Sequence, residues 1–169
     1  MGKLLGCFCA ALLIGGVIDS TVLGNRSEPT SESSARTLRA VDGDTLVVLQ
    51  GSVEQRVRVL GINTPEVHGH KECGGEAASQ AAKHWVQQND IVTLRSDPAA
   101  PDRDRYGRLL RYVEAAGMSP EPGTDLSSMQ VRDGHARVAA YGQDLSAIAT
   151  LRALERQAKS AKRGLWARC

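Results

Sequence analysis

Acidic and basic side chains recur beside the β-branched runs of this sequence, in a set that suits chemistry at a phosphate group. Asp42 and Asp44 flank a glycine in VDGDT, and carboxylates at alternating strand positions can hold a hard cation on one face. Arg58 lies in QRVRVLGI, Glu66 follows the turn Asn-Thr-Pro, and Arg108 opens RLLRYV. Phosphodiester hydrolysis uses such a set, because guanidinium groups and a cation neutralise developing charge while a carboxylate takes a proton from water.

Each of these motifs also has a purely structural interpretation. Asp-Gly is a common hairpin signal, so Asp42 and Asp44 can simply form a turn. Alternation along RVRVLGI puts Arg56 and Arg58 opposite the valines, so these arginines face solvent if the valines fill the core. The segment DRDRYGR can be a solvated charged loop; its start imitates a calcium loop, but Val113 stands where an EF-hand needs glutamate, which excludes that motif.

The N-terminus has the pattern of an export signal. Lys3 precedes an apolar run over residues 4–18, and this run is shorter than the ~20 residues that cross a bilayer. Residues 1–24 are therefore predicted to be a signal peptide, and the protein to be secreted or in the cell envelope, without stable membrane association after cleavage. Cleavage removes one cation, Lys3, and one anion, Asp19, so the net charge stays +2.

Two cysteines remain after the predicted cleavage, Cys73 and Cys169. An even pair in an exported protein predicts a disulfide, worth about 4 to 5 kcal/mol by loop entropy. The alternatives are two free thiols or a zinc site in which Cys73 joins His68 and His70.

The remaining chain divides into a linker and one domain. Residues 25–36 are rich in Ser, Glu and Pro without an apolar period, which predicts a flexible linker. Residues 37–169 are long enough for one core. Strands are expected at residues 37–41, 45–50, 55–62, 91–96 and 108–115, with a short strand at 136–138.

Helical periodicity indicates about three helices. They are expected at residues 74–90, from an N-cap at Asp125 to just before Gly134, and at residues 145–161 with Gly164 as the stop. In the first helix, Ala77, Ala81 and Trp85 share one face and should point to the core. Five main strands with these helices predict an α+β fold, a small closed barrel with helices against one side.

The motifs together resemble those of the staphylococcal nuclease (thermonuclease) family. They are VDGDT at 41–45, RVLGINTPE at 58–66, GGEA at 74–77, DRYGR at 104–108, VRDGHARV at 131–138 and KRGLW at 162–166. The resemblance covers about residues 37 to 166. It implies a five-stranded OB-fold barrel with three helices, a monomer, and Ca²⁺-dependent cleavage of DNA and RNA to give 3′-phosphate ends.

The resemblance also implies a metal site. Asp44 matches a calcium ligand, and Thr64 matches a residue that offers its backbone carbonyl. Asn63 stands where an aspartate ligand is expected, and Asp42 falls on an acidic position just behind the ligands. The neutral amide should weaken calcium binding by roughly 1 to 3 kcal/mol, or about one to two powers of ten.

The catalytic roles carry over in the same way. Glu66 corresponds to the proposed general base, and Arg58 and Arg108 correspond to the two arginines that contact phosphate. Tyr106 matches a residue of the nucleotide pocket, and Arg105 is expected to add a phosphate contact.

A second departure concerns base stacking. Ala140 stands where an aromatic residue is expected, and Tyr141 follows one place later. The alternative to an enzyme is an OB-fold module that binds nucleic acid but cuts it weakly or not at all.

Overall fold

A computed structural model describes residues 30–117, 124–140 and 144–169. The predicted signal peptide at 1–24 lies outside these residues, as does the first part of the predicted linker. Within the described residues, no helix combines the length and apolar character needed to cross a membrane.

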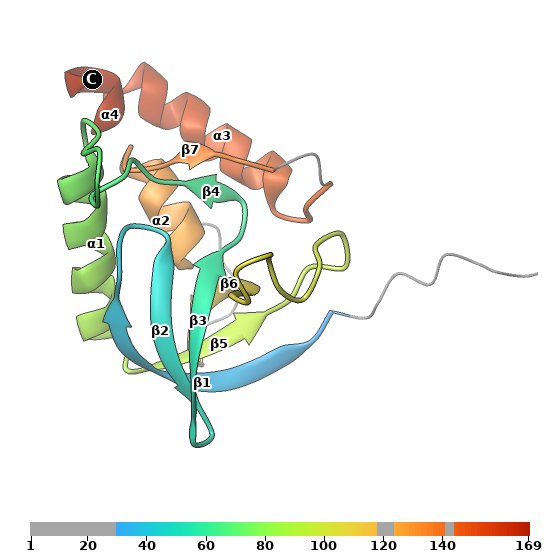
Figure 1. The fold of residues 1–169 in the computed structure, drawn as a ribbon. Helices are drawn as coiled ribbons and strands as arrows, with labels where there is room; N and C mark the ends of the chain where they lie inside the picture. The colour runs from blue at the N-terminus through green and yellow to red at the C-terminus, as the bar shows by residue number, and fades with distance from the viewer. Residues whose placement is uncertain (1–29, 118–123, 141–143) are drawn as a thin grey trace, which may run out of the picture.

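Five strands close into a barrel (Figure 1). They are β1 (Glu32–Ala40), β2 (Thr45–Gln50), β3 (Val53–Val59), β5 (Ile91–Arg95) and β6 (Leu109–Ala115). Around the barrel the order is β1-β2-β3-β6-β5, in which β3 and β6 pair in parallel and the other neighbours are antiparallel. This architecture agrees with the predicted OB-type barrel.

The barrel interior is filled by alternate residues of its strands, as a period of two requires. Fully buried examples are Leu46 and Val48 of β2, Val57 of β3, Val92 and Leu94 of β5, and Val113 of β6. Val57 and Val59 of β3 therefore fill the core, which puts Arg58 on the opposite face of that strand.

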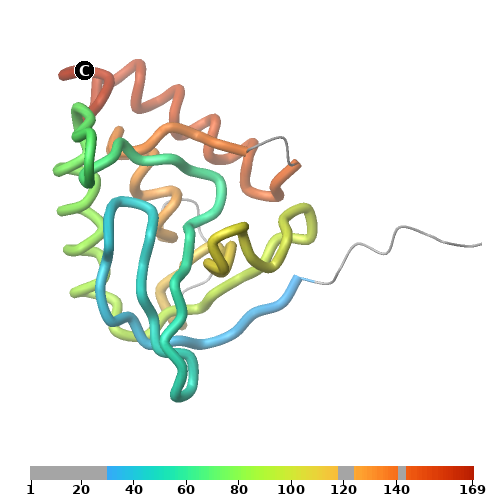
Figure 2. Tube along the Cα trace, viewed as in Figure 1, coloured from blue at the N-terminus to red at the C-terminus, as the bar shows by residue number. Residues whose placement is uncertain are grey.

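Helices cover one side of the barrel (Figure 1). They are α1 (Gly75–Gln88), α2 (Leu126–Arg132), α3 (Ile148–Ser160) and the short α4 (Leu165–Arg168). Asp125 caps α2 as predicted, because its side chain accepts a hydrogen bond from the Ser128 backbone N–H. A small second sheet pairs β4 (Ile62–Asn63) with β7 (Arg137–Val138), so the two segments run side by side in Figure 2.

The predicted inner face of α1 is wrong for Ala77, and Ala81 is only partly buried. Ala78 and Ala82 are buried beside Trp85, whereas Ala77 is exposed. Gly75 lies on the same buried face as Ala78 and Ala82, and it packs against the preceding segment, where an added Cβ would lie 2.5 Å from the Glu66 carbonyl oxygen.

Several element boundaries also differ from the predictions. The strand expected at 55–62 is β3 (Val53–Val59) followed by the separate β4 (Ile62–Asn63), and α3 begins at Ile148 rather than 145. Strand β1 begins at Glu32 inside the predicted linker, because residues 32–36 pair with β5 from Arg95 to Ile91. Helix α3 ends at Ser160, and Gly164 lies just before α4 rather than stopping α3. Gly164 is needed there because it has a positive φ of 49° and its backbone packs directly against Gly134.

Candidate functional site

Asp44 is the buried acid at the centre of the site. Asp42 shapes the turn before β2, because its Oδ1 accepts a hydrogen bond from the Asp44 N–H at 3.0 Å. Asp44 Oδ2 then accepts from the Thr64 N–H at 2.8 Å and from Thr64 Oγ1 at 2.9 Å. Gly43 permits this approach, since an added Cβ would lie 2.7 Å from the Thr64 side chain. The turn thus serves to aim a carboxylate inward.

Arg58 lies beside Asp44 and is buried, with 9% of its surface exposed. Its Nη2 is 3.3 Å from Asp44 Oδ2 and donates to Asn63 Oδ1 at 3.0 Å, while Nη1 donates to the Val59 carbonyl at 2.9 Å. Arg56, two residues earlier, is exposed. Arg58 therefore does not face open solvent, although it lies on the face opposite the core valines.

The pKa of Asp44 reflects this burial. Loss of water raises the pKa of the carboxyl above its ordinary value, and the Arg58 charge and the Thr64 hydrogen bonds offset that effect only in part. The nearby Asp42 charge raises the pKa further. A nearby cation would therefore stabilise the ionised form of the Asp44 carboxylate.

Arg108 reaches the same region from the start of β6. Its Nε donates to Asp104 Oδ2 at 2.7 Å, and the backbone N–H groups of Tyr106 and Arg108 donate to Asp104 Oδ1 at 2.9 and 3.0 Å. Burial acts to raise the pKa of Asp104, but the hydrogen bonds from Arg108 and Tyr106 outweigh it and hold the pKa below its ordinary value. Asp104 thereby fixes both the loop and the guanidinium.

Thr45 connects the two arginines, and sequence reasoning gave it no role. It pairs with Arg58 across β2 and β3, accepts from Arg108 Nη1 at 3.4 Å and donates to Asp44 Oδ1 at 3.3 Å. Arg58 and Arg108, distant in the chain, thus converge on Asp44 and Thr45. The only sequence signal was the position of Thr45 inside VDGDT.

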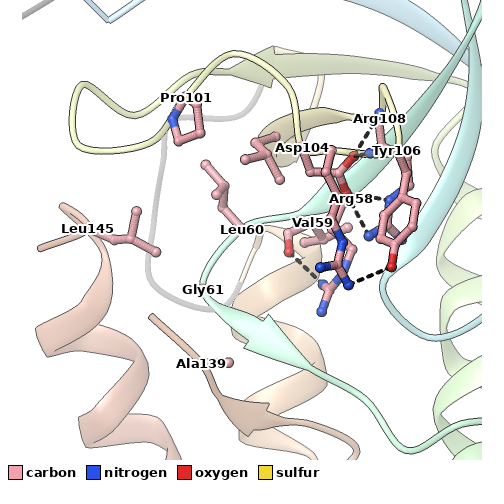
Figure 3. Close-up of a pocket in the computed structure, with 12 residues that line it drawn as sticks. Arg58, Val59, Leu60, Gly61, Pro101, Asp104, Tyr106, Arg108, Ala139 and Leu145 are labelled. Carbon is pink, nitrogen blue, oxygen red and sulfur yellow. Dashed lines mark hydrogen bonds and ion pairs between the residues drawn. The ribbon is translucent and has the colours of Figure 1, made fainter. Parts of the chain in front are cut away.

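A cavity of about 450 Å³ opens beside the arginines (Figure 3). Its polar lining comes from Arg58, Asp104, Arg105, Tyr106 and Arg108. Its apolar lining comes from Val59, Leu60, Pro101, Leu110, Ala139 and Leu145. Figure 3 shows the arginines, Asp104 and Tyr106 gathered at one end, with Leu60, Pro101 and Leu145 away from them. Such a cavity can hold an anionic group at one end and an apolar ring at the other.

Tyr106 is the exposed aromatic residue of this cavity, with 68% of its surface accessible. Arg105 and Arg108 both lie over its ring, at 4.8 and 5.5 Å from the centroid. Arg105 Nη2 also donates to the Tyr106 hydroxyl at 2.6 Å. The ring and the two cations form one surface on which a phosphate and a base can lie together.

Glu66 does not line the cavity, and neither do Asp44, Asn63 and Thr64. The Glu66 residue is exposed and follows Thr64 by two positions, so it enters the region from the segment that contacts Asp44. Its backbone is held by Glu72, another residue that sequence reasoning did not single out. Arg58 connects Asp44 with the cavity, because it lines the cavity and also forms an ion pair with Asp44.

The oxygen atoms around Asp44 suit a hard cation better than zinc. Asp44 Oδ1 contacts only a rotatable hydroxyl, that of Thr45, among its described hydrogen bonds. Within the described ranges, no three His, Cys, Asp or Glu side chains gather in a way that could hold a metal. A cation here would use a carboxylate with amide, carbonyl, water and substrate oxygens, which is a set that calcium accepts.

The alternatives to a disulfide were two free thiols or a zinc site of Cys73, His68 and His70. Cys73 is bonded to Cys169 in a disulfide with a Cα–Cα distance of 5.8 Å, so it is not a zinc ligand. His68 Nε2 lies 3.3 Å from the Val41 carbonyl.

Ala140 packs in an apolar cluster with Leu60 and Leu145, while Tyr141 lies outside the described residues.

The structure combines a closed OB-type barrel with two arginines, from β3 and from the loop before β6, that converge beside a buried carboxylate. The chain belongs to the staphylococcal nuclease homologue family, whose sequence profile matches residues 56–168.

Several relatives are similar over most of this chain. Endonuclease YncB of Bacillus subtilis (strain 168) is 35% identical over 134 residues, which are 77% of this chain and 60% of that protein. Thermonuclease of Staphylococcus hyicus is 28% identical over 156 residues, covering 89% and 83%. An uncharacterized endonuclease of Escherichia coli O157:H7 is 32% identical over 131 residues, covering 78% and 75%. The chain thus spans less than two thirds of the Bacillus protein and most of the other two.

Proposed function

We propose that this protein is an exported, calcium-dependent nuclease that hydrolyses phosphodiester bonds of DNA and RNA. The observation that carries the proposal is the convergence of Arg58 and Arg108 on one cavity, beside the buried carboxylate of Asp44. The names of the relatives, endonuclease and thermonuclease, support the same activity.

The arginines bind the scissile phosphate and neutralise the charge that develops on its oxygens. Forked guanidinium groups suit this task because each can donate two hydrogen bonds to phosphate. Both arginines already have carboxylate partners, Asp44 and Asp104, which hold them in place before substrate arrives. Preorganised donors cost little reorganisation during the reaction.

Glu66 takes the proton from the attacking water, because its carboxylate is exposed and, among the described residues, has no arginine partner such as those of Asp44 and Asp104. Arg105 adds a phosphate contact, and Tyr106 supports the nucleotide base by stacking.

Asp44, Asn63 and the Thr64 carbonyl would hold calcium, with Asp42 adding negative charge nearby. When bound, calcium supplies Lewis-acid polarisation of a phosphoryl oxygen. The raised pKa of the buried Asp44 supports this assignment, because a cation would relieve the cost of keeping that carboxylate ionised.

The Cys73–Cys169 disulfide supports export, since disulfides persist in oxidising compartments. We propose a secreted or cell-envelope location, a signal peptide at residues 1–24, a monomeric state and no stable membrane association.

The activity is tested by incubating the purified protein with single-stranded DNA, double-stranded DNA and RNA, with calcium or with chelator. Cleavage that needs calcium supports the proposal, and a Glu66→Gln variant should bind substrate yet cut far more slowly. Substrate that is retarded in a gel but stays uncut across millimolar calcium would overturn it.

That second outcome would favour a nucleic-acid-binding module. The observation that favours this alternative is Asn63, a neutral residue whose amide oxygen accepts a hydrogen bond from Arg58. A weak metal site would leave binding by the arginines intact and remove cleavage.

A further inference from the structure

The segment between Glu66 and α1 closes on itself through Glu72. The Glu66 backbone N–H donates to Glu72 Oε2 at 3.0 Å, and the Glu72 N–H donates to the Glu66 carbonyl at 2.9 Å. The Gly75 N–H donates in turn to the Glu72 carbonyl at 3.1 Å. Glu72 therefore ties both backbone groups of Glu66 to the first residue of α1.

The next residue, Cys73, is covalently joined to the C-terminal residue Cys169. Gly74 packs against Leu165 of α4, and the Leu165 N–H donates to the Gly134 carbonyl at 2.8 Å. Figure 2 shows the C-terminus beside the segment that enters α1. The residue next to Glu72 is thus bonded to the residue that follows α4, which is distant in the chain.

Little hydrophobic packing holds this segment. Glu66, His68, His70 and Glu72 are exposed, and Val67 is only partly buried. The contact of His68 with the Val41 carbonyl, at 3.3 Å, adds one further polar tie. Segments with few buried apolar contacts open most easily, so a covalent bond at one end matters more here than in a packed core.

We propose that Glu72, anchored by the Cys73–Cys169 disulfide, is a positioning residue for Glu66, and that cleavage is therefore fastest in the oxidised protein. This inference rests on the proposed nuclease function. A dithiol reduces the disulfide with two electrons and two protons, giving two cysteine thiols and the oxidised reductant. The freed segment then holds Glu66 less closely over the scissile phosphate.

The arginines respond differently to reduction. Arg58 lies on β3 and Arg108 at the start of β6, and both are fixed by Asp44, Asp104 and Thr45 rather than by the disulfide. Reduction should therefore lower kcat about tenfold while KM changes by less than about twofold. Reoxidation should restore kcat.

The first experiment compares the wild-type protein and the Glu66→Gln variant, each with and without dithiothreitol, at saturating DNA. If reduction acts through Glu66, the residual rate of the variant is insensitive to dithiothreitol. A fall by equal factors in both proteins would mean general loosening and would overturn the proposal. Circular dichroism at the assay temperature establishes that the reduced proteins are folded.

The second experiment keeps the disulfide and changes Glu72, so it remains decisive if reduction unfolds the chain. Glu72→Ala removes the acceptor for the Glu66 N–H and should lower kcat about tenfold, whereas Glu72→Gln keeps an acceptor oxygen and should retain most of the rate. Glu76→Ala is the matched control, an exposed acid of α1 whose carboxylate bonds only to Gln80 among its described side-chain contacts. Equal rates for Glu72→Ala and Glu76→Ala would overturn the proposal.

The proposed function and the positioning role of Glu72 would be refuted by different results. No cleavage by the oxidised wild-type protein would defeat the proposed function. A normal cleavage rate that is unchanged by reduction and by Glu72→Ala would refute only the positioning role.

Discussion

Asp44 and Arg58 form a buried ion pair, with 3.3 Å between Oδ2 and Nη2, in which each side chain is about nine-tenths buried. The acid proposed to hold calcium and the arginine proposed to hold phosphate therefore neutralise each other before any ligand binds. A cation at Asp44 would compete with Arg58 for the carboxylate, so that more of the Arg58 positive charge would be available to bind the phosphate. Calcium and substrate should accordingly strengthen each other's binding.

Removing Arg58 should damage both cleavage and stability. Arg58→Ala deletes a preorganised phosphate donor, which should lower kcat/KM by about two to three powers of ten. It also leaves Asp44 buried without its partner, which should lower the free energy of unfolding by about 3 to 5 kcal/mol. Cleavage assays and urea unfolding measure the two effects.

Arg56 provides the matched control, because it is an exposed arginine on the same strand. Arg56→Ala should change the free energy of unfolding by no more than about 0.5 kcal/mol. Similar losses from both variants would show that net charge, not the buried pair, matters.

Asn63 is the proposed calcium ligand whose charge should set the calcium requirement. Asn63→Asp supplies an anionic oxygen, and we expect the calcium concentration for half-maximal cleavage to fall by about one to two powers of ten. The hydrogen bond from Arg58 to Asn63 Oδ1 can be kept by a carboxylate. A calcium titration of the cleavage rate measures the change, and an unaltered requirement would count against Asn63 as a ligand.

The sequence predicted the barrel well because its strands are strongly patterned. The runs TLVVLQ and RLLRYVEA carry β-branched or apolar residues between turn signals, and they form β2 and β6. The face of α1 was harder, since alanine occupies positions 77, 78, 81 and 82 and the apolar pattern alone fits more than one rotation. In the structure the buried face is the one that contains Gly75, which packs against the Glu66 backbone.

The candidate site shows the same limit. Alternation placed Arg58 opposite the valines, but it could not show that Asp44 and Asn63 cover that face. Thr45 was missed as a partner of Arg108, because that contact joins β2 to the distant loop before β6. Asp104 was missed although it lies only four residues before Arg108 in the same loop. Residue types predict chemistry, whereas tertiary contacts decide which side chains meet.

Asp97 should make stability depend on pH. It is 3% exposed, and its Oδ2 accepts from the Tyr112 hydroxyl at 3.0 Å and from Ser146 N–H and Oγ at 2.8 and 2.7 Å, while Oδ1 accepts from the Ala99 N–H at 2.9 Å. Burial acts to raise the pKa of Asp97, but these hydrogen bonds outweigh it and lower the pKa below the ordinary 3.8. Burial and the Asp97 charge raise the pKa of Tyr112 to about 12.

The direction of the change in stability with pH follows from the lowered pKa of Asp97. The ionised carboxylate stabilises the folded state above the ordinary pKa, and this contribution is lost as the pH falls through the native pKa. Asp97→Asn should thus lower the free energy of unfolding by about 1 to 3 kcal/mol at neutral pH, and the gap to wild type should close below about pH 4. Urea unfolding between pH 2 and 8 tests this, with the exposed Asp90→Asn as control. A gap that persists unchanged at low pH would contradict it.

Asp104 should act on cleavage through Arg108. Its carboxylate lies 2.7 Å from Arg108 Nε and also accepts two backbone N–H groups of the same loop. In Asp104→Asn, an amide NH₂ can face the guanidinium instead of an acceptor, so Arg108 loses its fixed orientation. We expect kcat to fall about tenfold, less than in Arg108→Ala, which loses the phosphate contact itself. Combining the two substitutions separates these effects: if Asp104 acts only by orienting Arg108, the double variant cuts as slowly as Arg108→Ala alone, and fully multiplicative losses would refute that role.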